Sequence, residues 1–294
     1  MTRRKLTDAL MTGVFSAAGW VAIVFIFLIF LFTFKEAAPA LDLKTLKAFF
    51  FSNPPVWQPT SEVPKLSFIP IILGTLKATA VGLLFACPIG VAAALFSSEF
   101  APPRLREIIK PVVELLAGIP SVVMGFFALI VLATWLQNAF GLTYRLNAIN
   151  AGLALGFALV PIVYTISEDG LAAVPRSYRE ASYALGATKF QTAIKVVLPA
   201  AAPAVFASFV LAFGRAIGET MILLMAGGNA AITSLSLLDP LRTLSATIAA
   251  EMGEVVVGSE HYSALFFMGT LLFVITFISN SAGHWAIRRL QRHG

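Results

Sequence analysis

Charge is scarce in this sequence. Only 12% of its 294 residues are Asp, Glu, Lys or Arg, whereas 58% are hydrophobic. Soluble domains carry about 25% charged residues, so an ordinary water-facing surface is excluded. Several apolar runs exceed the roughly 18–20 residues that cross a bilayer as a helix, and such continuous runs are not the short alternating strands of a membrane barrel. The composition therefore predicts an all-α membrane protein with several spans.

Cysteine and histidine are also sparse. The one cysteine, Cys87, lies in an apolar run and cannot form an internal disulfide, so we interpret it as a structural thiol. The three histidines are scattered without metal-ligand spacing, and we expect no metal site. The chain also lacks the G-x-x-x-x-G-K-[ST] loop that binds nucleotide phosphates. We therefore expect neither catalysis nor a bound cofactor in this chain.

Windows of about 20 residues predict six transmembrane helices within one membrane domain, residues 1–294. The predicted spans are 13–34, 70–97, 111–137, 149–168, 203–227 and 262–282. Residues 38–40 (APA) are similar to a signal-peptidase site, but the first span exceeds the about 7–15 apolar residues of a signal peptide, so we expect a retained helix. The prolines of the connection 35–67 disfavour regular structure there.

Lysine and arginine are distributed unevenly about these spans. The N-terminus, the loops 98–110 and 169–202 and the C-terminal tail together hold 13 of these residues, and the opposite segments hold six. Loops rich in Lys and Arg stay in the cytoplasm. We therefore predict that both termini and the loop 169–202 are cytoplasmic. We interpret the net charge of +6 as part of this orientation signal, and we expect no nucleic-acid partner.

The loop 169–202 carries the signals of two short helices joined by a turn. Residues 177–180 (SYRE) and 188–191 (TKFQ) each fit a capping box, in which two side chains satisfy free amides at a helix start. Gly186, between them, can adopt the left-handed backbone that ends a helix. Two interpretations fit this pattern: a surface that docks a partner, or an ordinary amphipathic segment at the membrane interface.

The same loop resembles the EAA motif of ABC importer permeases. That motif reads E-A-A, three residues, G, nine residues, I-x-L-P, and the chain has Glu180-Ala181-Ser182, then Gly186, then residues 196–199 (VVLP). Serine stands in place of the third alanine, and valine in place of isoleucine. The resemblance implies a coupling helix in which Glu180, Ala181 and Gly186 contact a cytoplasmic ATPase, and we expect Phe190, near the turn, to join them. ATP and Mg would then be used by that partner.

Two opposite charges lie within the fifth predicted span. In the segment "GRAIGET", Arg215 and Glu219 are four residues apart, so on a helix they would share one face and could pair. Each central charge costs roughly 2.5–3.5 kcal/mol on insertion scales, a cost that leucine would avoid. We interpret the two residues as part of a substrate pathway, in which the guanidinium binds an oxyanion and Glu219 holds the arginine between substrates. The alternative is a structural ion pair.

Other polar or helix-breaking residues occur within the spans. Lys77 is close enough to one end of its span to reach the interface, and we interpret it as structural. Glu114 lies near the start of the third span, and Pro120 interrupts that span before Ser121, which leaves backbone groups free to line a cavity. A simple proline kink explains this segment equally well. Glu114, Pro120 and Ser121 are therefore candidates for lining the pathway.

Three further segments, "LLAGIPSVVMGFFAL", "GRAIGETM" and "EMGEVVVGSEHYSALFFMGTLLFVITF", together resemble the permease subunits of bacterial high-affinity phosphate ABC importers, of the type called PstC. The resemblance extends from about residue 66 to the tail. The chain departs from this pattern at Met124, where tyrosine is frequent, and at residues 222–223, which are Ile-Leu where Ala-Val is usual. In that family the residues matched by Arg215 and Glu219 are associated with phosphate passage.

This resemblance implies a type I ABC importer permease in the bacterial inner membrane. Its partners would be a sister permease, an ATPase subunit dimer, an extracytoplasmic phosphate-binding protein, inorganic phosphate and the surrounding lipid. One alternative is a permease for another oxyanion, such as molybdate, tungstate, sulfate or phosphonate. A second is an ion-coupled secondary transporter that would use Glu219 as carrier and would not require a docking loop.

Overall fold

The computed structural model describes the backbone of residues 3–291 and the side chains of residues 10–289. Arg292 and the side chains of residues 3–5, which contributed to the predicted orientation, lie outside the described residues. The elements in chain order are α1 (Arg3–Ala37), η1 (Ala38–Leu41), α2 (Leu43–Phe51), β1 (Trp57–Gln58), β2 (Lys65–Leu66), α3 (Ile69–Leu95), η2 (Phe96–Phe100), α4 (Pro103–Ala117), α5 (Ser121–Phe127), η3 (Ala128–Leu132), α6 (Ala133–Phe140), α7 (Ala148–Ala173), α8 (Arg176–Ala184), α9 (Lys189–Thr192), η4 (Ala193–Val197), α10 (Leu198–Ala200), α11 (Ala202–Gly218), α12 (Met221–Ala226), α13 (Leu244–Glu251) and α14 (Glu260–Gln291). Here η1 is a 3-10 helix, and η2, η3 and η4 are π-helical turns.

Within the described residues, five helical segments are long and apolar enough to cross a membrane. They are Leu10–Leu41, Ile69–Phe100, Ser121–Phe140, Ala148–Ala173 and Glu260–Arg289. A sixth span is possible in the pair Lys189–Ala200 and Ala202–Gly218, whose two parts meet at 66°. The predicted all-helical membrane fold with about six spans is confirmed.

The third predicted span, 111–137, is wrong as a single crossing. α4 ends at Ala117 and α5 begins at Ser121, because Pro120 holds an extended backbone (ψ 137°) and lacks an amide to continue the first helix. α4 carries charged residues through most of its length, from Arg104 to Glu114, and none of its side chains is buried. α4 is therefore an amphipathic helix beside the spans, and the crossing is made by Ser121–Phe140.

The connection 35–67 is more regular than its prolines predict. It contains α2, whose first turn is capped by the Asp42 carboxylate accepting from the amide of Lys44 at 3.3 Å. It also contains a short antiparallel hairpin, in which Trp57 pairs with Leu66. Pro39 lies in the first turn of η1, where its missing amide costs no helical bond. Pro54, Pro55, Pro59 and Pro64 fall between the elements, where no ladder hydrogen bond is lost.

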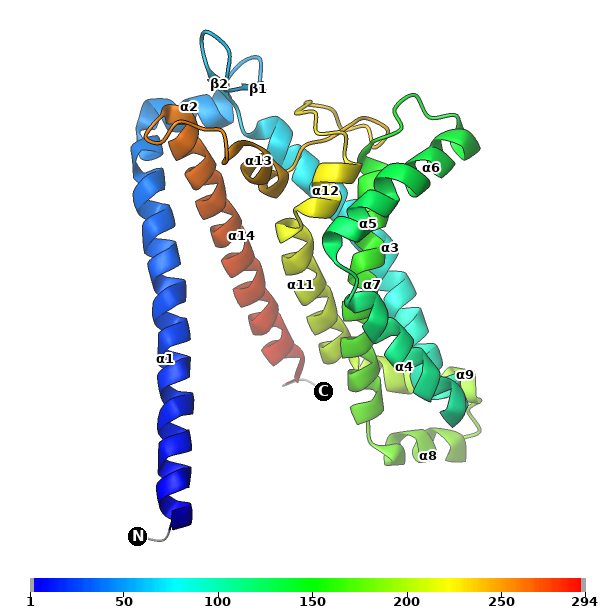
Figure 1. Cartoon of the computed structure of the whole chain (residues 1–294). Coiled ribbons are helices and arrows are strands. Elements are labelled where there is room, and N and C mark those ends of the chain that lie inside the picture. Colours follow the sequence, from blue (N-terminus) through cyan, green and yellow to red (C-terminus); the bar gives the residue numbers. More distant parts are fainter. Residues whose placement is uncertain (1–2, 292–294) are drawn as a thin grey trace.

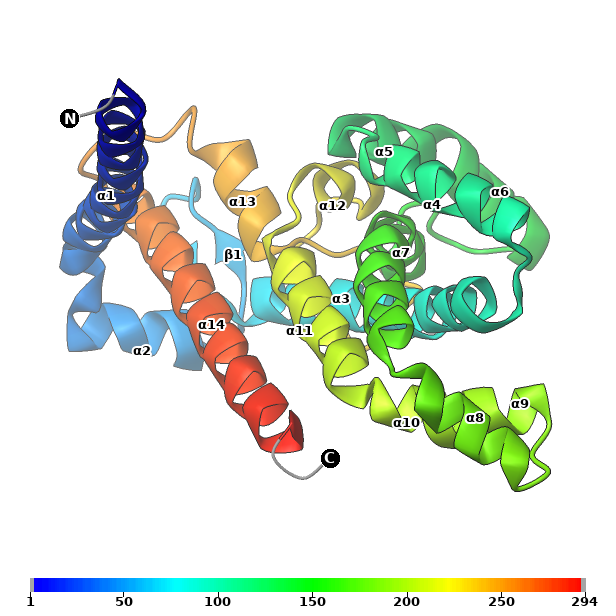
Figure 2. The same ribbon diagram turned by 90° about the horizontal axis from the view of Figure 1, so that it is seen from below.

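α3 and α7 pack along each other in the centre of the molecule, and α11 lies against α7 (Figure 1). α14 packs on α11, and α1 stands at the outer edge, where it contacts α14 through ring pairs such as Phe30 and Phe273, whose centroids are 4.7 Å apart. None of the apolar window of the first span is buried. Seen from below in Figure 2, α8, α9 and α10 form a separate limb that projects beyond α7 and α11.

Buried apolar residues form three clusters, and α3 passes through all of them. The first cluster, with Phe68 and Ile71, joins α2, α3, α13 and α14. The second packs small residues of α3 such as Ala78 and Ala86 against α7, α11 and α12, and Cys87 lies beside it as a free thiol. The third, with Tyr164, joins the ends of α3 and α7 to η4. Small side chains allow these helices to approach closely in a membrane.

At the end of the bundle opposite α8, where Figure 1 shows α13, the carboxylate of Glu251 has several partners. Glu251 of α13 accepts from Arg242 at 2.6 Å, from Trp57 at 3.1 Å, and lies 2.7 Å from the ring nitrogen of His261. These contacts connect the hairpin, the loop before α13 and the start of α14. This cluster therefore stabilises the segments that cover this end of the spans.

The first described turn of α1 and the last of α14 lie on the same side of the bundle as α8 and α9 (Figure 1). This arrangement agrees with the prediction that both termini and the loop 169–202 share one side. That this side is the cytoplasmic one stays a prediction from the distribution of Lys and Arg.

Candidate functional site

The predicted helix–turn–helix is present in the loop after α7. α8 and α9 are joined at Gly186, whose φ of +82° lies in the left-handed region that side chains with a Cβ rarely adopt. The second capping box is complete. Thr188 Oγ1 accepts from the amide of Gln191 at 3.2 Å, and Gln191 Oε1 accepts from the amide of Thr188 at 2.9 Å. These two predictions are confirmed.

The first predicted capping box, at Ser177 and Glu180, is wrong. α8 begins two residues earlier than that box predicts, at Arg176, and its N-cap is Pro175, which makes no side-chain cap hydrogen bond. Pro175 supplies the extended backbone (ψ 142°) that opens the helix. Ser177 therefore lies inside the first turn and cannot occupy the capping position.

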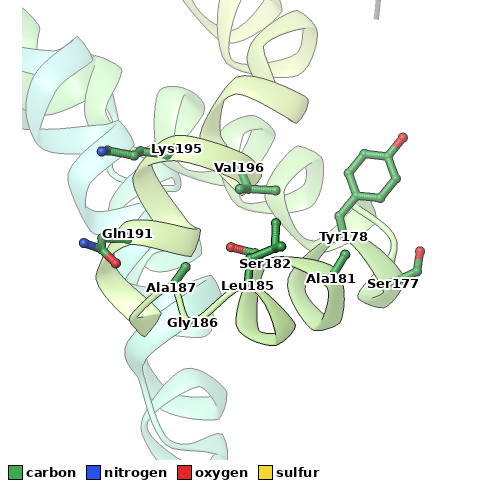
Figure 3. A pocket seen from close by; sticks show the side chains of 10 residues that line it. All are labelled: Ser177, Tyr178, Ala181, Ser182, Leu185, Gly186, Ala187, Gln191, Lys195 and Val196. Carbon is green, nitrogen blue, oxygen red and sulfur yellow. The ribbon is translucent and has the colours of Figure 1, made fainter.

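α8 and the chain that returns after Gly186 enclose a groove of about 800 Å³. Figure 3 shows its lining residues, which come from both sides of the turn: Ser177, Tyr178, Ala181, Ser182, Leu185, Gly186, Ala187, Gln191, Lys195 and Val196. Most of these side chains are small or apolar. Ala181 and Gly186 of the predicted coupling residues line the groove, whereas Glu180 and Phe190 do not.

Large apolar side chains are exposed around this groove. Leu185 is 89% exposed and Phe190 is 64% exposed. Glu180 is exposed as well, on α8. Contiguous apolar side chains facing solvent mark surfaces that bind another protein. The limb formed by α8 and α9 therefore has the composition of a docking surface.

Arg179 connects this limb to the spans. Its guanidinium forms a two-pronged pair with Glu99 of η2, with N–O distances of 2.6 and 3.2 Å. It also donates to the carbonyls of Val174 at 2.7 Å and Leu171 at 3.0 Å, at the end of α7. The hydrogen bond with Glu99 raises the pKa of Arg179 above its ordinary value. Arginine suits this site because its planar fork can donate to several acceptors at once.

A second buried carboxylate holds α4 against the same end of the spans. Glu168 of α7, with 1% of its side chain exposed, pairs with Arg106 and lies 3.5 Å from Lys110. Lys110 also pairs with Asp169 at 3.1 Å, and this hydrogen bond raises the pKa of Lys110. The ion pairs of Arg106 and Lys110 with Glu168 and Asp169 hold α4 against the end of α7.

Glu99, Glu168 and Arg179 were not among the residues predicted to act in coupling. Both glutamates come at the ends of long apolar runs, where they could equally be solvated residues at a membrane surface. The partner of Arg179 is 80 residues away along the chain. A signal was nevertheless present, because a carboxylate adjoining an apolar run needs a cation if it is buried.

Arg215 and Glu219 form no ion pair among the described residues. α11 ends at Gly218, and Glu219 is its C-cap, whose ψ of 127° turns the following chain out of the helix. The predicted pairing of these two side chains is therefore wrong. Arg215 is exposed, and with none of the residues that the structure describes does it form an ion pair or hydrogen bond.

The break between α11 and α12 is stabilised from the side. Ser245 Oγ donates to the carbonyl of Glu219 at 2.7 Å, and Thr220 Oγ1 donates to the carbonyl of Gly218 at 3.2 Å. Both bonds satisfy backbone groups that the end of α11 leaves free. The predicted span 203–227 is thus a helix that stops within the membrane region and restarts at Met221.

Lys77 is buried in α3 and donates to the carbonyl of Ser236 at 3.0 Å. Its ammonium therefore holds the loop before α13, as the structural interpretation predicted.

The three candidate lining residues of the third predicted span lie around its break. Glu114 is exposed in the last part of α4, Pro120 is exposed as the N-cap of α5, and Ser121 is half-buried. The predicted interruption at Pro120 is confirmed. It leaves the first amides of the helix at Ser121 without helical partners. Among the described side chains, residues 10–289, no group of three or more His, Cys, Asp or Glu is arranged to hold a metal ion.

The family model described as "Binding-protein-dependent transport system inner membrane component" matches residues 86–292. The "Probable ABC transporter permease protein YqgH" of Bacillus subtilis (strain 168) is 39% identical over 76% of this chain and 72% of its own length. The "Phosphate transport system permease protein PstC" of Mesorhizobium japonicum is 32% identical over 98% of this chain and 92% of its own. Both are similar to this chain over most of its length.

Solved structures share the fold at low sequence identity. A chain of a bacterial alginate ABC transporter, in complex with its alginate-bound periplasmic protein, has a TM-score of 0.69 at 15% identity and covers 97% of this chain and 96% of its own. A chain of the MetNI methionine ABC transporter has a TM-score of 0.58 at 21% identity and covers 74% of this chain and 93% of its own.

We expect Ser182→Ala to loosen the turn between α8 and α9. Ser182 Oγ lies 2.9 Å from Thr192 Oγ1, and both side chains are buried, so the substitution leaves the Thr192 hydroxyl without this partner, at a cost of about 1–3 kcal/mol. Hydrogen exchange of the amides in 188–197 should become faster. Ser177→Ala removes an exposed hydroxyl from the same helix and should change nothing. Equal exchange in the two variants would contradict the cross-turn bond.

Proposed function

The chain belongs to the family of binding-protein-dependent transport system inner membrane components, and we propose that it carries inorganic phosphate across the membrane. It is a multi-pass permease subunit of an ABC importer and not itself an enzyme. Phosphate is the substrate named for a relative that aligns with 98% of this chain, and the segments around Gly118 and Arg215 resemble permeases of that type.

The observation that carries the proposal is that Arg215, in an apolar helix, is exposed and has no polar partner among the described residues. Arg215 lies 13 residues into α11, about 20 Å from the helix start at a rise of 1.5 Å per residue. We place the start of α11 near one edge of a hydrocarbon layer about 30 Å thick, so that Arg215 lies inside it. An exposed and unpaired guanidinium at that depth costs roughly 2.5–3.5 kcal/mol or more if lipid surrounds it. This cost favours a face of α11 that is covered by a second permease and adjoins water. Arginine in such a path is suited to phosphate, whose oxygens accept its planar donors.

Glu219 has a different role from the one expected of an ion-paired residue. It lies at the break between α11 and α12, four residues beyond Arg215, and is partly exposed. We place it beside the pathway, where its negative charge limits how strongly an anion is held near Arg215. Pro120, Ser121 and Glu114 lie at the other helix break, and we assign them to the lining of the same pathway.

The limb of α8 and α9 is proposed as the site that docks the ATPase. Its exposed apolar tip, at Leu185 and Phe190, and the groove lined by Ala181 and Gly186 support this role. Glu180 would contribute a charge at the rim, because it is exposed beside the groove. The turn at Gly186 and its groove favour protein docking over an ordinary segment at the membrane interface, because contact with lipid would not require them.

The permease works with other ABC transporter components. We propose that these are a sister permease, an ATPase dimer that uses ATP and Mg, and an extracytoplasmic phosphate-binding protein, all at the bacterial inner membrane. The chain offers no nucleotide-binding loop, so the energy would come from the ATPase. Membership in this family removes the ion-coupled secondary transporter as an alternative. Molybdate, tungstate, sulfate and phosphonate remain competing substrates.

Phosphate should stimulate ATP hydrolysis by the complete complex, reconstituted in lipid with its binding protein. We expect no stimulation by molybdate, tungstate, sulfate or phosphonate at the same concentration, because the binding protein and the pathway would both select the substrate. The measurement is the hydrolysis rate with each anion. Stimulation by one of the competing anions, and not by phosphate, would assign the importer to that anion.

Arg215→Ala should lower phosphate uptake by about 10- to 100-fold, the equivalent of losing a hydrogen bond to a charged group worth about 1.5–3 kcal/mol. Assembly of the complex should be unchanged, because Arg215 contacts none of the described residues through a polar bond. Uptake of labelled phosphate by proteoliposomes measures the effect. Arg104→Ala, which removes an exposed charge from α4, is the control and should transport normally. Normal uptake by the Arg215 variant would remove this residue from the pathway.

Gly186→Val should prevent docking of the ATPase. A β-branched residue strains the backbone at φ of +82°, so the turn and its groove would rearrange. Co-purification of the ATPase subunits measures docking. Gly186→Asn is the matched control, because asparagine tolerates the left-handed region. A Val variant that retains the ATPase as well as the Asn variant does would refute the role of this turn.

A further inference from the structure

The side chain of Arg179 is the point at which α8 is attached to the spans by polar bonds. Its guanidinium reaches Glu99 and the carbonyls of Leu171 and Val174. The side chains of Arg179 and Glu99 are 18% and 6% exposed, so the pair is largely shielded from water. Charge-assisted, two-pronged bonds of this kind are the strongest hydrogen bonds in proteins and restrict orientation as well as distance.

These acceptors belong to two different spans. Glu99 lies in η2, the π-helical turn that continues α3, and Leu171 and Val174 lie at the end of α7. The last carbonyls of a helix lack helical amide partners, and Arg179 donates to two carbonyls at this end of α7. The carbonyl of Leu171 also accepts from the amide of Val174 at 3.3 Å. One guanidinium therefore joins α8, α3 and α7.

Few other contacts join α8 itself to the spans. The neighbouring η4 packs on α3 and α7 in the third apolar cluster, but no residue of α8 belongs to that cluster. Ser182 is the one residue of α8 that is buried, and its hydroxyl contacts Thr192, which belongs to the same limb. Pro175 connects α8 to α7 through an extended residue and not through a continuous helix. A force applied to α8 would be transmitted poorly through that link without the bonds of Arg179.

We propose that Arg179 is a positioning residue that makes α8 move as one body with the ends of α3 and α7 that lie nearest to α8. The proposal rests on the proposed function, in which the ATPase docks on α8 and phosphate passes through the spans. When the ATPase displaces α8, the guanidinium would carry that displacement to the two helices at the centre of the fold. Without it, α8 would follow the ATPase while the spans stay behind.

A role for Arg179 in stability alone would change transport and hydrolysis differently from a role in transmitting movement. If Arg179 merely keeps the protein folded, its loss lowers the amount of complex, so that hydrolysis and uptake fall together. If it transmits movement, the ATPase still docks and hydrolyses ATP, but fewer phosphate ions cross for each ATP. The ratio of phosphate transported to ATP hydrolysed separates the two roles.

The experiment uses the complete complex in proteoliposomes, with Arg179→Ala compared with the unchanged protein. We expect the ATPase to co-purify and the ratio of labelled phosphate taken up to ATP hydrolysed to fall by about tenfold or more, because all four bonds are lost. Arg176→Ala removes an equally charged residue three positions earlier in α8, which is exposed and has no polar partner among the described residues. This control should keep the ratio of the unchanged protein.

If the alanine variant does not assemble, the Arg179→Lys variant tests the same proposal with the same ratio of transport to hydrolysis. A lysine ammonium is a point charge that can hold Glu99 but cannot also reach both carbonyls in the geometry of the planar fork. We expect its ratio to be reduced by about threefold, between those of alanine and arginine. An unchanged ratio in the alanine variant, or in the lysine variant if alanine does not assemble, overturns the proposal. If the unchanged complex imports another oxyanion, the proposed substrate fails, and the same ratio measured with that anion still tests Arg179.

Discussion

Hydrocarbon solvates neither charge nor an unpaired peptide group, and this constraint arranges the whole chain. Partnered charges gather at the two ends of the bundle, around Glu251 at one end and around Glu99 and Glu168 at the other. Between these ends the helices meet through alanine and other small residues, which need no polar partner. Some polar side chains within the spans pair with one another, as Tyr164 does with Ser97 at 2.9 Å and Ser167 with Ser208 at 3.2 Å. Arg215 is exposed and has no polar partner among the described residues, which is why we propose that a second permease covers its face.

The end of the bundle that carries α8 combines a rigid part with a surface left open. The rigid part is where α3 and α7 pack together. Arg179 joins α8 to this part, and the third apolar cluster joins η4 to it. The open surface is the tip at Leu185 and Phe190, which no described residue covers fully. An apolar tip on a firmly held base is the arrangement expected of a part that transmits force between two proteins.

The breaks in the helices have a shared physical origin. At Pro120 the missing amide ends the path of α4, and at Glu219 an extended residue ends α11, where Ser245 satisfies the freed carbonyl. Broken helices inside a membrane are tolerated where protein or water satisfies their backbone groups. Pro120 could be recognised from residue type, since proline is a helix breaker in any context. The break at Glu219 has only a weak local signal, because Gly218, just before it, can end a helix but glycine is also frequent inside membrane helices.

The sequence by itself determined the class of the molecule, the approximate places of its spans, the turn at Gly186, the capping box at Thr188 and the resemblance to ABC importer permeases. Each of these depends on neighbouring residues: a run long enough to cross a bilayer, a glycine where φ must be positive, a threonine three residues before a glutamine. Only the tertiary structure decided that α4 lies beside the spans, that α11 stops at Gly218 without an ion pair between Arg215 and Glu219, and that Arg179 binds Glu99. These outcomes depend on groups far apart in the chain, 80 residues in the last case, whose pairing is set by how the helices pack and not by local periodicity.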